Sequence, residues 1–203
     1  MANQKHTQDP LDLDEAMSAS EAFIIKYKNK FLIGIAAIVI VVGGFLGYKN
    51  FISEPNEIKA AEALFKGEQY FGNSSYEIAL NGDSLGYEGF LKVADEFSGT
   101  DAGELANAYA GICYAQLGQY ENAVKYLNKF SADDHLVSPA ILGTMGNCYA
   151  QLGELDKAAA TLVKAADKAN SHALSPIYLI QAGQIYEKLG KNSEAVNAYK
   201  AIK

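Results

Sequence analysis

Three patterns of hydrophobic and polar positions follow one another along the chain. In residues 1–30, side chains three or four positions apart fall roughly on one helical face, which predicts an amphipathic helix. That face consists of Leu13, Met17, Ser20, Ile24 and Tyr27. Residues 31–50 begin with a run that is apolar on every face, and residues 57–203 show the periodicity of successive amphipathic helices. The sequence therefore predicts an all-α protein, with an N-terminal transmembrane helix followed by a solenoid of helical hairpins.

The apolar run extends from Phe31 to Tyr48, which is 18 residues without a charge. As a helix it would be about 27 Å long, close to the roughly 30 Å of a bilayer's hydrocarbon core. It is too long, and begins too far into the chain, for a cleaved signal peptide. Residues 31–50 are therefore predicted to cross a membrane. Within this span, Gly43 and Gly47 could form a face on which another membrane helix packs, or their spacing could be chance, because glycine is common in such helices.

The lysines that flank the span predict its orientation. Lys26, Lys28 and Lys30 precede it, whereas Lys49 alone follows it closely. Because positive residues favour the cytoplasmic side, we expect a cytoplasmic tail and an external C-terminal part, which would be periplasmic in a Gram-negative bacterium. The tail helix could bind a cytoplasmic partner or lie on the inner leaflet of the membrane.

The C-terminal part contains a repeat. The stretch GICYAQLGQYENAV, which begins at Gly111, recurs with changes 35 residues later from Gly146 and a further 37 residues later from Gly183. Each copy has a glycine, a tyrosine three residues on, a second glycine and then an alanine. These residues are Gly111, Tyr114, Gly118 and Ala123; Gly146, Tyr149, Gly153 and Ala158; and Gly183, Tyr186, Gly190 and Ala195.

Each position of the repeat has a physical explanation. The first glycine lets a neighbouring helix approach closely, and the tyrosine packs in the groove between helices. The second glycine suits the left-handed position after a helix, and the alanine is small where two helices cross. Each copy is thus predicted to form a helix A, a tight turn and a helix B, which bury their apolar faces only when copies stack.

The junctions between copies are also similar, with HLVSP ending at Pro139 and HALSP ending at Pro176. Ser138 and Ser175 are predicted as helix N-caps, each followed by proline at the first helical position. The shared place of the two junction histidines favours a structural role over a metal or proton-relay site. Cys113 and Cys148 also occupy equivalent positions, so we expect small buried hydrophobic residues rather than a disulfide.

A degenerate first copy is predicted in residues 57–100, where Gly67 and Tyr70 have the familiar spacing. Its middle, residues 72–84, is longer than a repeat turn and is predicted as an inserted loop. At the other end, the last copy stops within its helix B. We therefore expect apolar side chains to be exposed there, and the natural chain to continue or another element to cover them. The expected exposed residues are Ala195, Ala198 and Tyr199.

The period and the positions of glycine, tyrosine and alanine resemble the tetratricopeptide repeat (TPR) family. The resemblance covers roughly residues 104–203, as repeats 104–137, 139–173 and 176–203 of a TPR-like domain that spans 57–203. It departs from the family where a tryptophan is usual early in helix A, because Asn107, Leu142 and Leu179 stand there. The family implies a helical solenoid that binds proteins.

Charge and motif content exclude several functions. All 17 basic residues are lysines against 24 acidic residues, and the net charge of −7 comes without a basic stripe, so nucleic acid is not an expected partner. No metalloprotease, nucleophile-elbow or phosphate-binding motif occurs. We expect no enzyme activity, no cofactor, no bound metal and no small-molecule substrate.

The resemblance implies a protein-binding concave face formed by the A helices. Counting from the signature, this face is predicted to comprise Ala108, Ile112, Gln116, Gly143, Asn147, Gln151, Ile180, Gln184 and Lys188. With Lys188 its only basic residue, the face does not suit the TPR mode that grips a C-terminal carboxylate. It suits an extended backbone or apolar side chains, unless it is merely solvated and partners bind elsewhere.

A short tail, one span and an external repeat array together look like the ancillary subunit family of the Sec translocon. This resemblance implies a single-pass protein of the bacterial inner membrane, with SecYEG and a membrane-anchored periplasmic chaperone of the prolyl-isomerase type as partners. Two alternatives are a scaffold of another envelope assembly or secretion complex and a non-catalytic regulatory subunit of a membrane enzyme.

Overall fold

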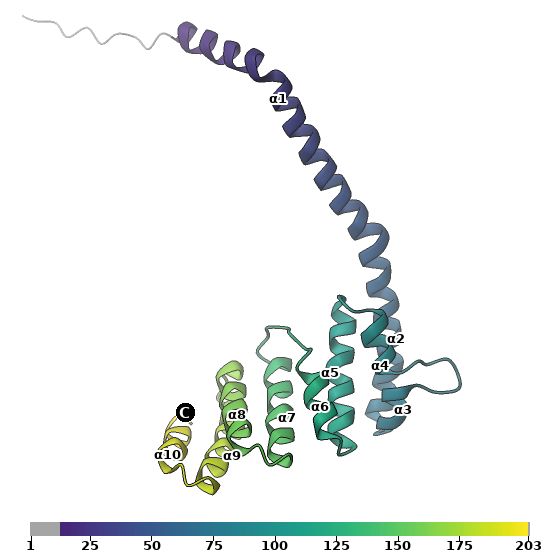
Figure 1. The fold of residues 1–203 in the computed structure, drawn as a ribbon, viewed down its shortest axis with the longest axis vertical. Coiled ribbons are helices and arrows are strands. Elements are labelled where there is room, and N and C mark those ends of the chain that lie inside the picture. Colours follow the sequence, from purple (N-terminus) through teal and green to yellow (C-terminus); the bar gives the residue numbers. More distant parts are fainter. Residues whose placement is uncertain (1–12, 203) are drawn as a thin grey trace, which may run out of the picture. The chain divides into compact units, whose positions relative to one another are not determined.

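The structure, a computed structural model, describes residues 13–202, with side chains from Ile24 onward. It is all-helical, with no strand in residues 13–202, and divides into two compact units between Ile52 and Ser53 (Figure 1). The first unit contains α1 (Leu13–Tyr48), and a π-helical segment, Lys49–Ser53, follows it at the division. The second unit contains α2 (Glu54–Gly72), α3 (Tyr76–Asn81), α4 (Phe90–Glu96), α5 (Asp101–Gln116), α6 (Tyr120–Leu127), α7 (Val137–Gln151), α8 (Leu155–Ala169), α9 (Ser175–Lys188) and α10 (Asn192–Lys200).

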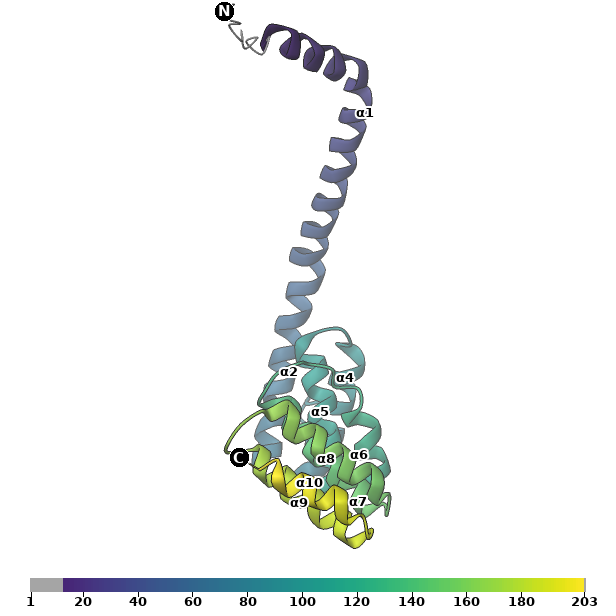
Figure 2. The same ribbon diagram turned by 90° about the vertical axis from the view of Figure 1, so that its left-hand side faces the viewer.

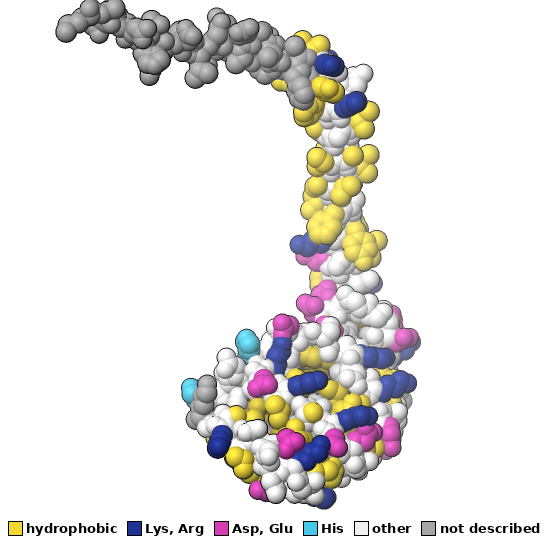
Figure 3. Space-filling model, turned by 60° about the vertical axis from the view of Figure 1, so that its left-hand side comes forward, with side chains coloured by type: hydrophobic (Ala, Val, Ile, Leu, Met, Phe, Trp, Pro, Cys, Tyr) yellow, Lys and Arg dark blue, Asp and Glu magenta, His cyan; other side chains and the backbone are white. Residues whose placement is uncertain are grey.

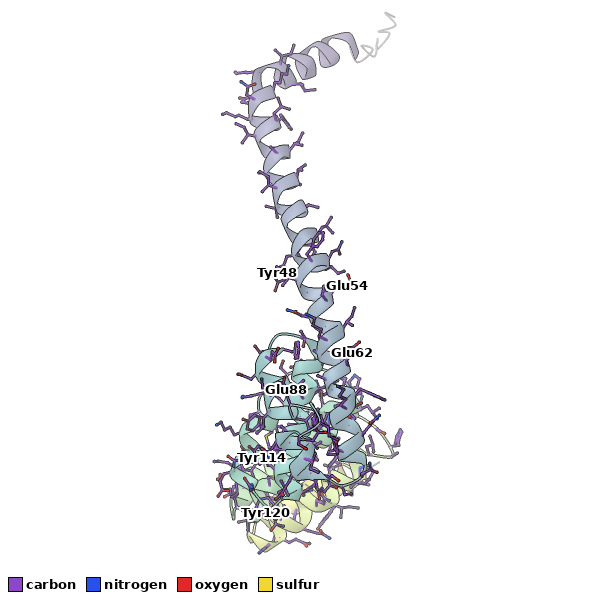
Figure 4. All side chains as sticks on the ribbon, turned by 90° about the vertical axis from the view of Figure 1, so that its right-hand side faces the viewer. Tyr48, Glu54, Glu62, Glu88, Tyr114 and Tyr120 are labelled. Atoms are coloured by element: carbon purple, nitrogen blue, oxygen red, sulfur yellow. The ribbon has the colours of Figure 1, made fainter. Side chains whose placement is uncertain are left out.

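Helix α1 is long and apolar enough to cross a membrane. The helical residues Ile24–Gly72 include an 18-residue window with a mean hydropathy of 2.5, and none of this window is buried. Hydrophobic side chains cover the face of this helix that Figure 3 shows, and Ile40, for example, is 73% exposed. In Figure 4, Tyr48 marks the last residue of α1 and Glu54 the first acidic residue beyond it.

Helix α1 also includes part of the predicted cytoplasmic tail, because it begins at Leu13. Residues 1–12, and the side chains of Leu13, Met17 and Ser20 on the predicted amphipathic face, lie outside the described residues. Gly43 and Gly47 lie within α1, and a Cβ atom added at either would meet nothing within 4 Å beyond its chain neighbours and the adjacent backbone of its own helix.

In the second unit, the pairs α5–α6, α7–α8 and α9–α10 form successive hairpins stacked side by side, as Figures 1 and 2 show. Gly118, Gly153 and Gly190 follow the first helix of each pair with φ between 70° and 78°, which confirms the predicted left-handed turns. Ala123, Ala158 and Ala195 are at most 2% exposed, as expected where helices cross. Figure 4 labels Tyr114, near the end of α5, and Tyr120, at the start of α6, which lie on either side of one such turn.

Helices α2, α3 and α4 pack on α5 of the first hairpin and form a hydrophobic cluster with it. Phe90, fully buried, stacks on Tyr109 with ring centroids 5.0 Å apart. The α2 residue Glu57 accepts hydrogen bonds from the backbone N–H groups of Asp101 and Ala102, at 3.1 and 3.0 Å. These groups belong to the first turn of α5, where free N–H donors and the helix dipole favour a carboxylate. The segment from α2 to α4 is thus joined to α5 by packing and by a helix cap.

Three sequence expectations about this unit are wrong in detail: the inserted loop, the exposed C-terminal end and the serine N-caps. The segment predicted as an inserted loop, 72–84, contains α3, and the longer loop between α3 and α4 follows it. The apolar end predicted to be exposed is largely covered, since Ala195 and Ala198 are at most 5% exposed and Tyr199 is half-buried against α9. Ala195, Ala198 and Tyr199 are spaced as i, i+3 and i+4, which places them on one face of α10, and Tyr199 of this face packs against α9.

Ser138 and Ser175 are not N-caps. Both lie inside the first turn of their helices, and their hydroxyl groups donate back to the carbonyl oxygens of Ala132 and Ala166, at 2.5 and 2.7 Å. Each hydroxyl also accepts a hydrogen bond from the backbone N–H of the residue four positions earlier. The serines therefore tie the junction loop to the helix, while the Asp134 carboxylate accepts from the free N–H groups at the start of α7.

Candidate functional site

A hydrophobic groove runs across the first helices of the three hairpins. Its cavity has a volume of about 440 Å³. It is lined by Leu105, Ala108, Tyr109 and Ile112 of α5; Leu136, Val137, Ala140 and Ile141 at the start of α7; and Leu174 and Tyr178 at the start of α9. None of the ten lining residues is charged. Such a surface can remove apolar side chains of a partner from water, and it offers no ionic group for orientation.

The floor of the groove is held by packing of aromatic rings. The Tyr178 ring lies over Gly143, where an added Cβ would come within 2.5 Å of the ring, so the glycine lets the helices α7 and α9 approach closely. The Tyr109 hydroxyl donates to the Glu68 carboxylate at 2.9 Å, and burial raises the pKa of Tyr109 to about 12. Both tyrosines are therefore neutral at physiological pH, which keeps the groove uncharged.

The rim of the groove is exposed to solvent. Leu136 is 71% exposed and Val137 is 38% exposed, although both are large hydrophobic residues next to the buried Ile141. Exposed apolar groups next to a concave apolar cavity are typical of protein-binding surfaces rather than of a solvated face.

Only some of the predicted concave-face residues lie at the groove. Ala108 and Ile112 line the groove, whereas the other predicted residues do not. Gln116, Asn147, Gln151, Gln184 and Lys188 are exposed, and Ile180 is 43% exposed. The hydrophobic groove thus begins in the first turns of the A helices, and the exposed amide side chains lie further along them.

Sequence reasoning missed the contribution of the junctions. Val137 and Leu174 hold equivalent places in the HLVSP and HALSP segments, immediately before the repeated serine. We interpreted these segments only as helix starts, and the repeated apolar residue was the signal that they also line a surface. Tyr178 was missed because its ring crosses from α9 to cover Gly143 of the neighbouring hairpin.

The groups considered for chemistry have structural surroundings. Cys113 is fully buried, and burial raises the pKa of its thiol to about 12, so it is not a nucleophile at neutral pH. Cys148 is 2% exposed, and burial raises the pKa of its thiol as well. His135 forms a hydrogen bond through Nδ1 with the Lys168 carbonyl oxygen at 2.8 Å, which joins the junction to α8. Within the described part of the chain, no group of three or more His, Cys, Asp or Glu side chains could hold a metal ion.

Comparison with known families supports the repeat assignment. A model of the tetratricopeptide repeat matches residues 110–130, 139–167 and 177–202, which fall in the three hairpins. A search of curated proteins finds none that matches this chain. The fold is therefore an all-helical one with tetratricopeptide repeats, which are typical of protein-interaction scaffolds and typically non-catalytic.

Proposed function

We propose, from a fold built of tetratricopeptide repeats, that this chain is a membrane-anchored scaffold whose hydrophobic groove binds an extended segment of another protein. One observation carries the proposal. Three successive A helices and the junctions before them form a single cavity of about 440 Å³ that contains no charged side chain. A segment with apolar side chains would bury them there, and its recognition would depend little on sequence because no ionic group fixes its register.

The anchor in this proposal is α1, which crosses the inner membrane of a bacterium once. The three lysines Lys26, Lys28 and Lys30 before the apolar run support a cytoplasmic N-terminus, which leaves the repeats in the periplasm. Gly43 and Gly47 would then be available to another membrane helix, because neither has a neighbour on its open side within 4 Å.

The more specific proposal is an accessory role beside the Sec translocon, with contacts to exported chains or to a membrane-anchored periplasmic chaperone. The order of tail, span and repeat array supports it, since this order resembles the ancillary translocon subunits. A groove with little sequence preference also suits newly exported chains, whose apolar segments are extended and diverse.

Site-specific crosslinking tests both levels of the proposal. A photoreactive amino acid replaces Leu136, which is 71% exposed at the groove, in the full chain in native membranes, and the matched control replaces Val196, which is 47% exposed on α10. We expect Leu136 to capture SecYEG subunits, exported chains or a periplasmic chaperone. Enrichment of another envelope complex, or of a membrane enzyme, would rule out the translocon role but would still support the groove as the binding site. Equal capture by both positions would show that the groove is not the binding site.

A further inference from the structure

A second series of cavities repeats along the stack, away from the hydrophobic groove. The first lies among α4, α5 and α6, the second among α6, α7 and α8, and the third among α8, α9 and the C-terminal end of α10, with volumes of about 470, 590 and 370 Å³. Each cavity is lined by the residue at the same position of helix A, which is Asn107, Leu142 and Leu179 in turn. Only the first cavity therefore has a polar residue at this position.

Asn107 is 9% exposed, and only one of the two hydrogen-bonding groups of its side chain has a partner. The Nδ2 group donates to the Gly103 carbonyl oxygen at 3.1 Å, which fixes the orientation of the amide. The Oδ1 atom is buried and accepts no hydrogen bond from any described residue. A leucine would fill this position without leaving an acceptor unpaired, as Leu142 and Leu179 do in the other copies, so a buried amide at a cavity wall indicates a ligand for its oxygen.

The charges around this cavity indicate the sign of that ligand. Its two lysines already have partners, because Lys92 Nζ lies 2.8 Å from Glu88 Oε1 and Lys129 Nζ lies 4.6 Å from the centre of the Tyr126 ring. The side chains of Asp95 and Ser98, which also line the cavity, form no hydrogen bond or ion pair with any described residue. The groups without a protein partner are therefore the Asn107 oxygen and the Asp95 carboxylate, which only accept hydrogen bonds, and the Ser98 hydroxyl, which can accept or donate.

We propose that the cavity among α4, α5 and α6 binds an arginine side chain of a partner protein. The planar guanidinium group presents five N–H donors, enough for the Asn107 oxygen, the Asp95 carboxylate and the Ser98 hydroxyl together. This chain contains no arginine, so a second copy of it cannot supply the group. Its net charge of −7 also favours the approach of a basic segment. The site is independent of the hydrophobic groove, because the adjacent residue Ala108 faces the groove from another side of α5.

Titration of the isotope-labelled full chain in detergent micelles with N-acetyl-arginine amide tests this site. We expect saturable chemical-shift changes at the Asn107 side-chain amide. The neutral isostere N-acetyl-citrulline amide should bind at least about tenfold more weakly, because charge-assisted hydrogen bonds to Asp95 are lost. Asp95→Asn should weaken binding of the arginine amide in the same direction.

The variant Asn107→Leu should lose the binding while its thermal unfolding temperature does not fall, because it adopts the residue type of the equivalent positions. Asn197→Leu, an exposed position on α10, is the matched control and should bind as the natural chain does. Unchanged binding in both Asn107→Leu and Asp95→Asn would overturn the site. Equal binding of the citrulline amide would overturn the cationic ligand.

Discussion

The ring of Tyr199 in α10 lies directly over Gly183 in α9. A Cβ atom added at Gly183 would come within 2.4 Å of Tyr199 Cε1, closer than such atoms approach in proteins. The first glycine of the repeat therefore sets the distance between the two helices of the last hairpin, and the tyrosine ring takes the place of a side chain at this position.

We expect Gly183→Ala to lower the free energy of unfolding by about 1–3 kcal/mol, because the ring and α10 must move to accept the methyl group. Urea unfolding of the full chain in detergent, followed by tyrosine fluorescence, measures this change. Gly72→Ala is the matched control, because a Cβ there meets nothing within 4 Å and alanine favours the helix. A Gly183→Ala variant as stable as the control would contradict the packing assigned to this glycine.

Burial of Cys113 predicts a dependence of stability on pH. Its thiol has a pKa of about 12 in the folded protein, against about 8.5 in an unfolded chain. A raised folded pKa gives stability that is complete below the unfolded value and is lost as the pH rises towards the folded value. At pH 9.5 the loss should be about 1.4 kcal/mol.

Replacement of this cysteine isolates its contribution. Between pH 8 and 9.5, Cys113→Ala should lose less stability than the natural chain, although its stability at pH 7 is lower because a small cavity forms. Urea unfolding at the two pH values gives the difference for each protein. Parallel losses in both would show that Cys113 does not cause the dependence.

How far the sequence predicts this fold depends on the range of the interactions involved. Gly118 and its equivalents were predicted correctly because a left-handed residue after a helix is a local requirement. Ser138 was misassigned because its partner, the Ala132 carbonyl oxygen, lies in a junction loop whose path is set by tertiary packing. Asp134, four residues earlier, competes for the same N–H groups, and local propensity does not decide between them.

The candidate site was less predictable than the fold because it depends more on tertiary packing than on local sequence. Helical periodicity places Ala108 and Ile112 on one face, but it does not show where that face is concave. The cavity depends on how far α7 and α9 shift relative to α5, and therefore on contacts such as that of Tyr178 with Gly143. Sequence alone located the helices of the groove but not its ends.

The loop between α3 and α4 is predicted to depend on one carboxylate. Asp83 accepts hydrogen bonds from the Leu85 and Tyr87 N–H groups at 2.7 and 2.9 Å and from the Tyr70 hydroxyl at 2.5 Å. The hydrogen bond from Tyr70 is the main reason why the pKa of Asp83 lies below its usual value. The stabilisation is therefore present above the ordinary aspartate pKa and is lost as the pH falls through the lower folded value.

Asp83→Ala should make the loop more accessible to a protease that cleaves after leucine, because Leu85 at its tip is 90% exposed and loses its anchor. Tyr70→Phe removes one of the three hydrogen bonds and should have a smaller effect in the same direction. The rate of cleavage at Leu85 in the folded full chain measures both. Cleavage of Asp83→Ala at the natural rate would show that other contacts hold the loop.

The hydrophobic groove gives the most direct test of function. Ala140 is exposed and lines the groove at the start of α7, so Ala140→Glu places a carboxylate there without disturbing the core. A partner that buries apolar side chains would have to desolvate this charge without an opposite one nearby. We expect crosslinking from position 136 to fall at least about tenfold, which corresponds to roughly 1.4 kcal/mol of binding free energy. Val196→Glu adds the same charge on α10 and should leave that crosslinking unchanged.

Variants of the exposed amide residues further along the A helices distinguish two modes of partner binding. If the partner extends over them, Asn147→Ala and Gln151→Ala should each weaken crosslinking, because amide side chains hydrogen-bond an extended backbone. If binding is confined to the hydrophobic cavity, both variants should behave as the natural chain while Ala140→Glu fails. Loss in the amide variants with normal binding by Ala140→Glu would instead move the binding surface away from the cavity, because a charge in the cavity lining would then be tolerated.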